Sequence, residues 1–391
     1  MSDSKYALGS ITAEQFLSEY WQKKPLLIKQ ALPEFINPLS AEEIAGLACE
    51  DFVTSRLITE SKSTAQSPHS WHLQHGPFSE DDFLALPDAG WTLHAQGIER
   101  FFPDVYSLLD HFRFIPNWRI DDVMVSFAPD KGTAGPHFDQ YDVFLVQGLG
   151  KKHWRVGQRC DAQSPTLPNC DLSILKTFET SDEWIVEPGD VLYVPPGIAH
   201  YGIAIDDSIT YSIGFRAPSH SDLLGEFSHY LADTLTEDQR YTDPDLPPQN
   251  NPGEISAEAL TKVHKILSNT LNDPEKLARW FGEYMTESKQ QEVAYEFEAI
   301  QSPEQLLAEL SHANQLCWVE GVRCAWYQQP TGLDLFVNGQ RYECHACLKT
   351  LLELLSASTR IDIPVLLPEL DRSLAQQLLF ELFNAGYFYF E

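Results

Sequence analysis

The stretch that decides the fold is EPGDVLYVPPGIAH, residues 187–200. It contains a Gly-Asp turn, a four-residue apolar run and a Pro-Pro-Gly turn, and it brings His200 to the start of a further apolar run. A short apolar run between two such turns is typical of a buried β-strand. The sequence therefore predicts a β-structured region in which His200 lies at the mouth of a strand.

The residues on either side repeat this pattern. Short alternating or fully apolar runs follow one another from residue 91 to 218, separated by breaks rich in Gly, Pro and Asp. No helix of crossover length separates the central runs, so we expect an antiparallel sheet closed into a sandwich or barrel. The expected strands are 91–93, 123–127, 141–147, 153–156, 184–186, 191–194, 201–205 and 209–215.

The residues before this core predict peripheral helices. Thr12 and Ser40 each stand at the start of a capping box, and the apolar run 26–28 between them reads as a strand. A polar, Ser-rich loop is expected at 61–70.

After residue 219 the periodicity becomes helical. A Pro- and Asn-rich linker at 243–253 interrupts it, and Ser256 and Asp273 are N-cap candidates for two helices with apolar faces. These faces need a partner, which could be each other, the barrel or a second copy of the chain. A dimerisation segment is therefore one reading of this region.

The last 81 residues, 311–391, combine strands and helices. Asn338-Gly339 is a hairpin signal, and helices are expected at about 345–355 and 373–383, the second with Asp371 as its candidate cap. This order resembles a winged helix. The segment holds 5 Lys and Arg against 9 Asp and Glu, whereas DNA binding needs a basic surface, so we expect a protein-contact or structural role.

The composition indicates a strongly acidic globular protein. Its net charge is 27 − 57 = −30, and such a field repels a phosphate backbone and attracts cations. This favours a basic protein as partner, with solubility alone as the alternative.

No apolar run has the roughly eighteen residues of a membrane span, and residues 1–10 lack an export signal, so we expect a cytoplasmic protein without membrane contact.

The seven cysteines are an odd number scattered over a long chain, which predicts reduced thiols rather than a disulfide framework. Cys344 and Cys347 form one tight pair that could join Cys317 and Cys324 in a zinc site. A second close pair is missing, so ordinary half-buried cysteines are the alternative.

Residues 135–139, GPHFD, supply two further ligand-type side chains. His137 and Asp139 are two apart, so on a strand they point to the same face. His-x-Asp alone is a common pattern. His200, however, lies 63 residues after His137, where the Pro-Pro-Gly turn places it at the start of a strand. Two histidines and one carboxylate form the facial triad that leaves positions of an octahedral iron(II) open.

These motifs resemble the JmjC oxygenases of the cupin superfamily. The resemblance covers the opening FLSEYWQKKPLLI at 16–28, the His-x-Asp and Pro-Pro-Gly-x-x-His motifs, and the closing YSIGFR at 211–216. With the helical segment and the winged-helix-like tail, the whole chain is similar to the bacterial ribosomal oxygenases, which hydroxylate an arginine of a large-subunit ribosomal protein.

The resemblance implies a double-stranded β-helix catalytic domain at 1–218, a helical segment at 219–310 and a winged-helix-like domain at 311–391. The helical segment is read as the dimerisation segment of a homodimer. It implies iron(II) held by His137, Asp139 and His200, with 2-oxoglutarate as cosubstrate and O2 as oxidant. The expected reaction is hydroxylation of an arginine at Cβ in a basic ribosomal protein.

The family also needs a basic side chain for the distal carboxylate of 2-oxoglutarate. Lys151 and Lys152 follow at that place and must face opposite sides of a strand, so only one can point inward. The spacing in the wider family favours Lys152, although the ribosomal branch more often has arginine there. Lysine keeps the charge but gives up the bidentate fork, and a solvated lysine pair is the alternative. Ser126 corresponds to a hydroxyl that can bind the same carboxylate.

Two further sets of polar side chains lie outside these motifs. Asp130, on the loop between the Ser126 strand and His137, could pair with a substrate guanidinium, with an exposed loop aspartate as the alternative. The remaining histidines fit no second ligand set and are expected to be structural or exposed; they include His94, His111 and His153.

Two other functions remain open from the residues. A JmjC N-methyl-lysine demethylase would run the same hydroxylation on a methyl group and release formaldehyde. A metal-binding cupin without oxygenase activity would act as an assembly or regulatory module, and oxygen-dependent turnover of 2-oxoglutarate would reject that reading.

Overall fold

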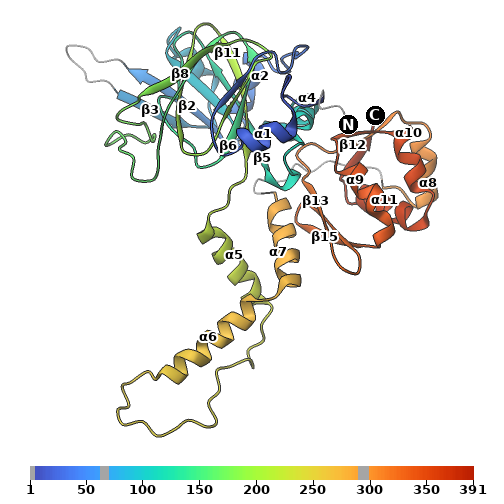
Figure 1. Cartoon of the computed structure of the whole chain (residues 1–391). Coiled ribbons are helices and arrows are strands. Elements are labelled where there is room, and N and C mark those ends of the chain that lie inside the picture. The colour runs from blue at the N-terminus through green and yellow to red at the C-terminus, as the bar shows by residue number, and fades with distance from the viewer. Residues whose placement is uncertain (1–4, 62–69, 289–298) are drawn as a thin grey trace.

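The structure is a computed structural model that describes residues 5–61, 70–288 and 299–391. The expected Ser-rich loop at 61–70 lies almost entirely outside the described residues. Figure 1 shows a β-rich N-terminal body, a helical segment that extends away from it, and a smaller C-terminal body beside it. No helix in the described ranges is long and apolar enough to span a membrane.

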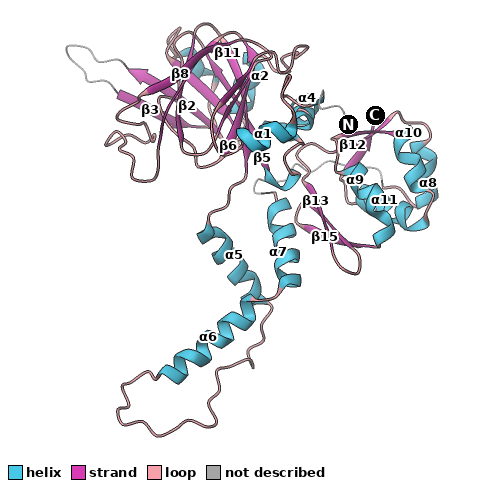
Figure 2. Ribbon diagram, viewed as in Figure 1, coloured by secondary structure: helices cyan, strands magenta, loops and turns pink. Residues whose placement is uncertain are grey.

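The N-terminal body is built from two antiparallel sheets (Figure 2). The large sheet has the order β1-β9-β6-β11-β5-β4-β2-β3 and the small sheet the order β10-β7-β8. The predicted antiparallel double-stranded β-helix is therefore confirmed. The strands are β1 Leu26–Ile28, β2 Ser55–Ser61, β3 Ser70–His75, β4 Trp91–Ala95, β5 Ile120–Ala128, β6 Asp142–Leu149, β7 Lys152–Arg159, β8 Thr180–Val186, β9 Val191–Val194, β10 Ile198–Ala204 and β11 Ser208–Phe215.

The two sheets pack face to face through apolar side chains at one end. Leu145 and Val194 of the large sheet share a buried cluster with Trp154, Val156 and Val186 of the small sheet. These residues lie at alternate positions of their strands, as the two-residue period of a half-buried strand requires. The remaining space between the sheets is lined by both polar and apolar residues.

Short helices cover the outer face of the large sheet. Phe16 of α1 (Ala13–Glu19) packs against Tyr193, with ring centroids 4.9 Å apart, and the Thr12 side chain caps this helix. Ser40 and Glu43 form the expected capping box of α2 (Ala41–Ala48). The peripheral position predicted for these helices is confirmed. The other helices of this body are α3 Glu80–Leu84 and α4 Pro103–Leu108.

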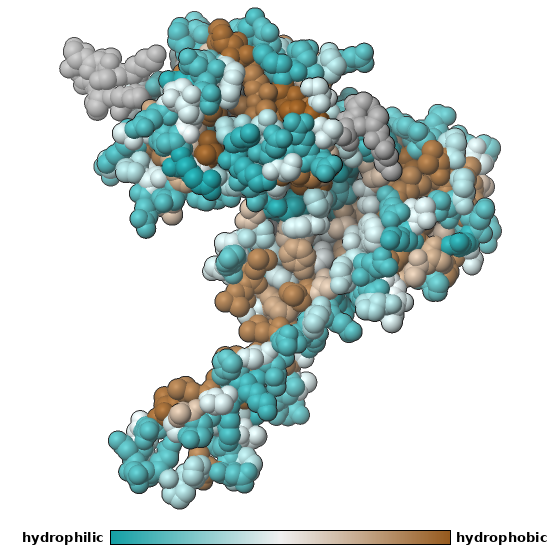
Figure 3. All heavy atoms as spheres, in the orientation of Figure 1, coloured by the Kyte–Doolittle hydropathy of each residue, from teal (hydrophilic) through white to brown (hydrophobic). Residues whose placement is uncertain are grey.

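The helical segment contains α5 (His220–Asp233), α6 (Ala257–Leu271) and α7 (Pro274–Thr286). Phe227 and Leu231 of α5 pack with Trp280 of α7. In contrast, α6 has no buried residue, and its apolar side chains stay exposed. Figure 3 shows hydrophobic residues gathered along this segment, and those exposed on α6 are Leu260, Val263, Ile266, Leu267 and Leu271.

The C-terminal body has the predicted winged-helix order. Asn338 and Gly339 both have positive φ, 46° and 80°, which is the conformation of a two-residue hairpin turn. The helix expected from 345 starts as a 3-10 turn and continues as α9. The elements are α8 Pro303–Leu310, β12 Gln315–Trp318, β13 Cys324–Gln328, β14 Leu333–Val337, β15 Gln340–Cys344, α9 Lys349–Leu355, β16 Arg360–Asp362, α10 Ile363–Leu366, α11 Ser373–Asn384 and β17 Phe388–Phe390.

The cap predicted for the last helix is wrong. The N-cap of α11 is Arg372, and no side chain caps it. Asp371 ends a 3-10 turn with helical angles, φ −64° and ψ −16°. It therefore lacks the extended backbone that an N-cap residue needs. The domain division after residues 218 and 310 stays a proposal. The second boundary directly follows α8, which assigns α8 to the helical segment although this helix packs on α11 of the C-terminal body.

Candidate active site

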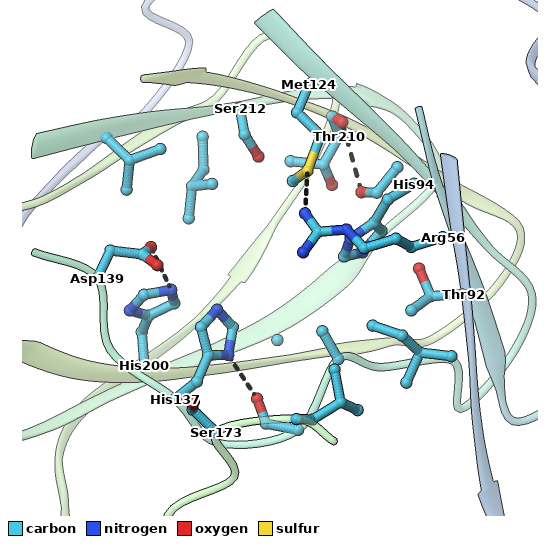
Figure 4. A pocket seen from close by; sticks show the side chains of 18 of the residues that line it. Arg56, Thr92, His94, Met124, His137, Asp139, Ser173, His200, Thr210 and Ser212 are labelled. Carbon is cyan, nitrogen blue, oxygen red and sulfur yellow. Dashed lines mark hydrogen bonds and ion pairs between the residues drawn. The ribbon is translucent and has the colours of Figure 1, made fainter. Parts of the chain in front are cut away.

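A cavity of about 380 Å³ lies between the two sheets of the N-terminal body. In Figure 4, His137, Asp139 and His200 stand on one side of it, and Arg56 and His94 point into it from the other. The cavity lining also includes Asp122, Ser126 and Lys152. Metal-ligand side chains and groups of both charges therefore face one enclosed space.

The two histidines and Asp139 form a compact cluster. Each offers one ligand atom, and these atoms all lie within 4.8 Å of one another. The shortest described contact joins His200 Nε2 and Asp139 Oδ2 at 3.6 Å. Across the described ranges this is the one group of three or more ligand-type side chains close enough to share an ion. The cysteines considered for zinc form no such group there.

The backbone fixes this cluster in a way that differs from our expectation. His137 and Asp139 do not lie within a strand: His137 forms an isolated bridge with His200, in which each residue's N–H donates to the other's carbonyl. Asp139 is held by the Gly197 N–H, which donates to its carbonyl oxygen over 2.7 Å.

Both histidines present the same ring nitrogen to the cavity. The Nδ1 atom lies 2.8 Å from the Gly135 carbonyl oxygen in His137 and 3.1 Å from that of Ile198 in His200. A carbonyl can only accept, so we assign the proton to Nδ1, which leaves the Nε2 lone pairs free to bind a metal. Burial, with His137 close by, lowers the pKa of His200 to about 4, so this ring is neutral at pH 7.

The adjacent lysines of β7 point in opposite directions. The Lys151 ammonium is exposed and lies 2.6 Å from Glu187. Lys152 is buried, lines the cavity and has its Nζ atom 3.5 Å from the Thr210 hydroxyl. Burial lowers the pKa of Lys152 to about 8. No carboxylate of the described residues forms an ion pair with it, so the cavity holds an uncompensated cation.

Comparisons with known proteins agree with this architecture. The family described as JmjC domain matches residues 107–223, and the family described as ROXA-like winged helix matches residues 269–389. The ribosomal protein uL16 3-hydroxylase of Escherichia coli (strain K12) is 33% identical over 376 residues, which cover 96% of this chain and 97% of that protein. The chain belongs to the JmjC-type ribosomal oxygenases.

Other members of this family support the assignment. The probable ribosomal oxygenase of Haemophilus influenzae is 41% identical over 237 residues, 60% of this chain and 55% of that protein. The X-ray structure of E. coli ycfD has a TM-score of 0.84 at 32% identity and covers 98% of this chain and 99% of that chain. The structure of YcfD in complex with cobalt and 2-oxoglutarate has a TM-score of 0.81 at 31% identity, with the same coverage.

Of the other site residues predicted for this ribosomal oxygenase, one faces the cavity and one does not. Ser126 is buried in the cavity wall, and its hydroxyl lies 3.4 Å from the Thr210 carbonyl oxygen. Asp130 lies outside the cavity lining, is about half exposed, and pairs with Lys131 at 2.7 Å. The structure therefore brings Ser126, but not Asp130, to the triad.

Sequence reasoning missed several cavity residues, of which His94 and Asp122 matter most for the site. His94, expected to be structural or exposed, lines the cavity from β4. Burial, with smaller contributions from Arg56, Lys152 and His137, lowers its pKa to about 3, so the ring is neutral. The other two histidines named with it stay outside the lining: His111 contacts the Lys5 carbonyl and His153 contacts Glu183.

The second missed residue is Asp122, four positions before Ser126 on β5. It lines the cavity, and its buried Oδ2 atom has no hydrogen-bond partner. Burial and the neighbouring Asp121 raise its pKa. Strand alternation could have found it, because a residue four positions from an inward-facing Ser126 on the same strand faces inward too.

Proposed function

We propose that this ribosomal oxygenase is an iron(II)- and 2-oxoglutarate-dependent hydroxylase that adds a hydroxyl to Cβ of an arginine in a large-subunit ribosomal protein, most directly uL16. The observation that carries the proposal is a 2-His-1-carboxylate cluster, with both Nε2 lone pairs free, on a cavity that also holds an uncompensated lysine. The E. coli relative is named for the same protein and reaction class.

The proposed metal site fits iron(II) chemically. Two neutral imidazoles and one carboxylate would occupy one face of the ion, and Asp139 would offset one of its two positive charges. When bound, iron(II) with 2-oxoglutarate and O2 supplies the oxidation: one oxygen atom enters the substrate C–H bond and the other enters succinate, with release of CO2. The residues of the chain bind and orient the reactants and exclude water.

Lys152 is the proposed partner of the distal carboxylate of 2-oxoglutarate. A buried ammonium without a carboxylate partner is costly, and a bound dianion would compensate it. The hydroxyls of Ser126 and Thr210 lie beside it and can donate to the same carboxylate.

Lys152→Ala should raise the 2-oxoglutarate concentration required for half-maximal turnover by at least about tenfold, because loss of one partner of a buried charge pair costs about 2–5 kcal/mol. Lys151→Ala is the matched control and should change this requirement less than about twofold, since the Lys151–Glu187 pair is exposed. Succinate formation measured against 2-oxoglutarate concentration checks both variants. The opposite order of effects would contradict the assignment of Lys152.

Charge supports a basic substrate. The chain carries a net charge of −30, and Asp122, whose Oδ2 atom has no hydrogen-bond partner, lines the cavity. Along β5, Asp122 lies roughly 13 Å from Ser126, which leaves room for a substrate side chain apart from the cosubstrate end. An acidic enzyme should recruit a free ribosomal protein before assembly, because rRNA phosphates would repel it from a finished subunit.

The substrate proposal predicts an added oxygen on free uL16. The purified enzyme should be incubated with iron(II), 2-oxoglutarate and uL16, and tandem mass spectrometry should place one added oxygen atom on an arginine, without formaldehyde release. An unmodified arginine, while 2-oxoglutarate is consumed with another basic protein, would overturn the substrate but leave the oxygenase standing.

We further propose that the enzyme is a cytoplasmic homodimer that binds neither DNA nor membranes. The exposed apolar face of α6 is the surface a second copy would cover, since this helix buries none of its own residues. The acidic C-terminal body lacks the basic surface that DNA binding needs. A monomer in sedimentation experiments at micromolar concentration would contradict the dimer.

A further inference from the structure

A continuous row of polar side chains crosses the large sheet at the cosubstrate end of the cavity. Strand register places Thr210 of β11 opposite both Gln147 of β6 and Ser126 of β5. The same row continues from Ser126 to His94 of β4, and from His94 to Arg56 of β2. Residues directly opposite one another share a face of the sheet and have Cβ atoms about 5 Å apart. Thr210, Ser126, His94 and Arg56 all line the cavity.

Lys152 reaches this row from the small sheet. Its Nζ atom lies 3.5 Å from the Thr210 hydroxyl, and Thr210 is the direct neighbour of Ser126. The next side chain along the row is His94. His94 is therefore the side chain nearest to the proposed carboxylate site to which no role has yet been assigned.

The His94 ring is available to a ligand. Within the described parts of the chain, neither ring nitrogen has a hydrogen-bond partner, and neither is sealed from the cavity. Arg56, Lys152 and His137 all act on it electrostatically, so the ring lies within range of both cations and of the metal cluster. The Arg56 guanidinium also lines the cavity, where it lies 3.9 Å from the Met124 sulfur in the next row (Figure 4).

We propose that His94 is a cosubstrate-binding residue that donates an N–H hydrogen bond to the distal carboxylate of 2-oxoglutarate beside Lys152. This inference rests on the proposed function. A lysine offers one compact charge and no planar fork, so it leaves acceptor sites of a carboxylate unfilled. A histidine directly beside Ser126 can fill one of them. Lysine and histidine together would then supply the two-point contact that a single arginine gives.

The protonation state of His94 suits this role. A neutral imidazole carries one N–H donor, whereas a charged ring would be repelled by Arg56 and Lys152. Because its pKa is about 3, the ring stays neutral at every pH at which the enzyme would be assayed. His94 therefore adds a directed hydrogen bond to the subsite and no charge; the positive charge comes from Lys152, with Arg56 also close to the ring.

Two ligands separate this contact from simple packing. The probes are 2-oxoglutarate and 2-oxopentanoate, which has the same carbon chain but a methyl group in place of the distal carboxylate. Dissociation constants should be measured by calorimetry on the full chain loaded with Mn(II), which avoids turnover. His94→Leu should weaken binding of 2-oxoglutarate by about tenfold or more, as expected for a lost hydrogen bond to a charged group. It should change binding of 2-oxopentanoate less than about twofold.

Other variants complete the test. His94→Gln keeps an N–H donor and should retain 2-oxoglutarate affinity within about threefold. Thr92→Val is the matched control on the same face of β4, where the Thr92 hydroxyl donates to the Phe127 carbonyl, and it should leave both affinities unchanged. If the leucine variant does not fold, His94→Asn, whose shorter side chain withdraws the N–H, should show the same selective loss.

Three outcomes are distinct. Equal weakening of both ligands, or unchanged 2-oxoglutarate affinity in the folded leucine variant, would overturn the role of His94. Wild-type protein that binds neither ligand would instead overturn the proposed function. A selective loss for 2-oxoglutarate in His94→Leu, with near-normal binding in His94→Gln, is the result that the proposal requires.

Discussion

Replacing His137, Asp139 or His200 with alanine is expected to abolish turnover of 2-oxoglutarate. Each substitution removes one of only three side-chain ligands, and even the loss of a residue that merely orients a ligand commonly costs 10–100-fold in metal affinity. We therefore expect iron(II) affinity to fall by more than about 100-fold in each of the three variants, as measured by equilibrium dialysis, with succinate formation at background. Near-normal turnover in any two variants would contradict the triad.

The fold should survive these substitutions. His137 and Asp139 lie outside the strands, and backbone hydrogen bonds that alanine retains hold both in place. Thermal unfolding should therefore stay within a few degrees of the wild type. His153→Ala is a matched control, because this histidine contacts Glu183 on the outer side of β7. It should leave metal binding, turnover and stability unchanged.

The metal cluster could be predicted from sequence because its chemistry restricts both residue type and spacing. Two histidines and a carboxylate are required, and the Pro-Pro-Gly turn fixes where His200 enters β10. The local backbone could not be predicted in the same way. We expected His137 and Asp139 to share a face because they lie two apart on a strand. In the structure, a single bridge between His137 and His200 positions them instead, and the periodicity of the local sequence does not encode such a bridge.

Strand alternation predicted that only one of Lys151 and Lys152 points inward, and the resemblance to the wider family selected Lys152. Asp130 could not be placed, because loop residues follow no period: its carbonyl accepts from the Gly90 N–H and its side chain pairs with Lys131. His94 was missed because its partners lie on other strands. Only the pairing of β2, β4 and β5 shows that it continues the row of Ser126.

The role proposed for Asp122 in substrate binding would oppose stability. Its carboxylate lies close to the buried Glu99 and the half-exposed Asp121. Burial raises the pKa of both Asp122 and Glu99, with added repulsion of Asp122 by Asp121 and of Glu99 by Asp122. Arg323 of the C-terminal body reaches the same region, where it donates to the Asp121 carbonyl. A carboxyl whose pKa rises on folding destabilises the folded state at any pH above that pKa. We infer that the chain retains Asp122 for substrate binding.

Asp122→Asn is therefore expected to separate activity from stability. Loss of the carboxylate should lower kcat/KM for an arginine-containing uL16 peptide by about 100-fold, since an unpaired buried guanidinium costs about 2–5 kcal/mol. The 2-oxoglutarate requirement should stay within about twofold, because Asp122 lies roughly 13 Å along β5 from Ser126.

The same variant should be at least as stable as the wild type at pH 7, because the repulsion between Asp122 and Glu99 is removed. Peptide kinetics and thermal unfolding on one preparation measure both effects. Unchanged kcat/KM would exclude Asp122 as the guanidinium partner. A large loss of thermal stability would show instead that the carboxylate is needed for folding, since a residue kept only for substrate binding can lose its charge without cost to the fold.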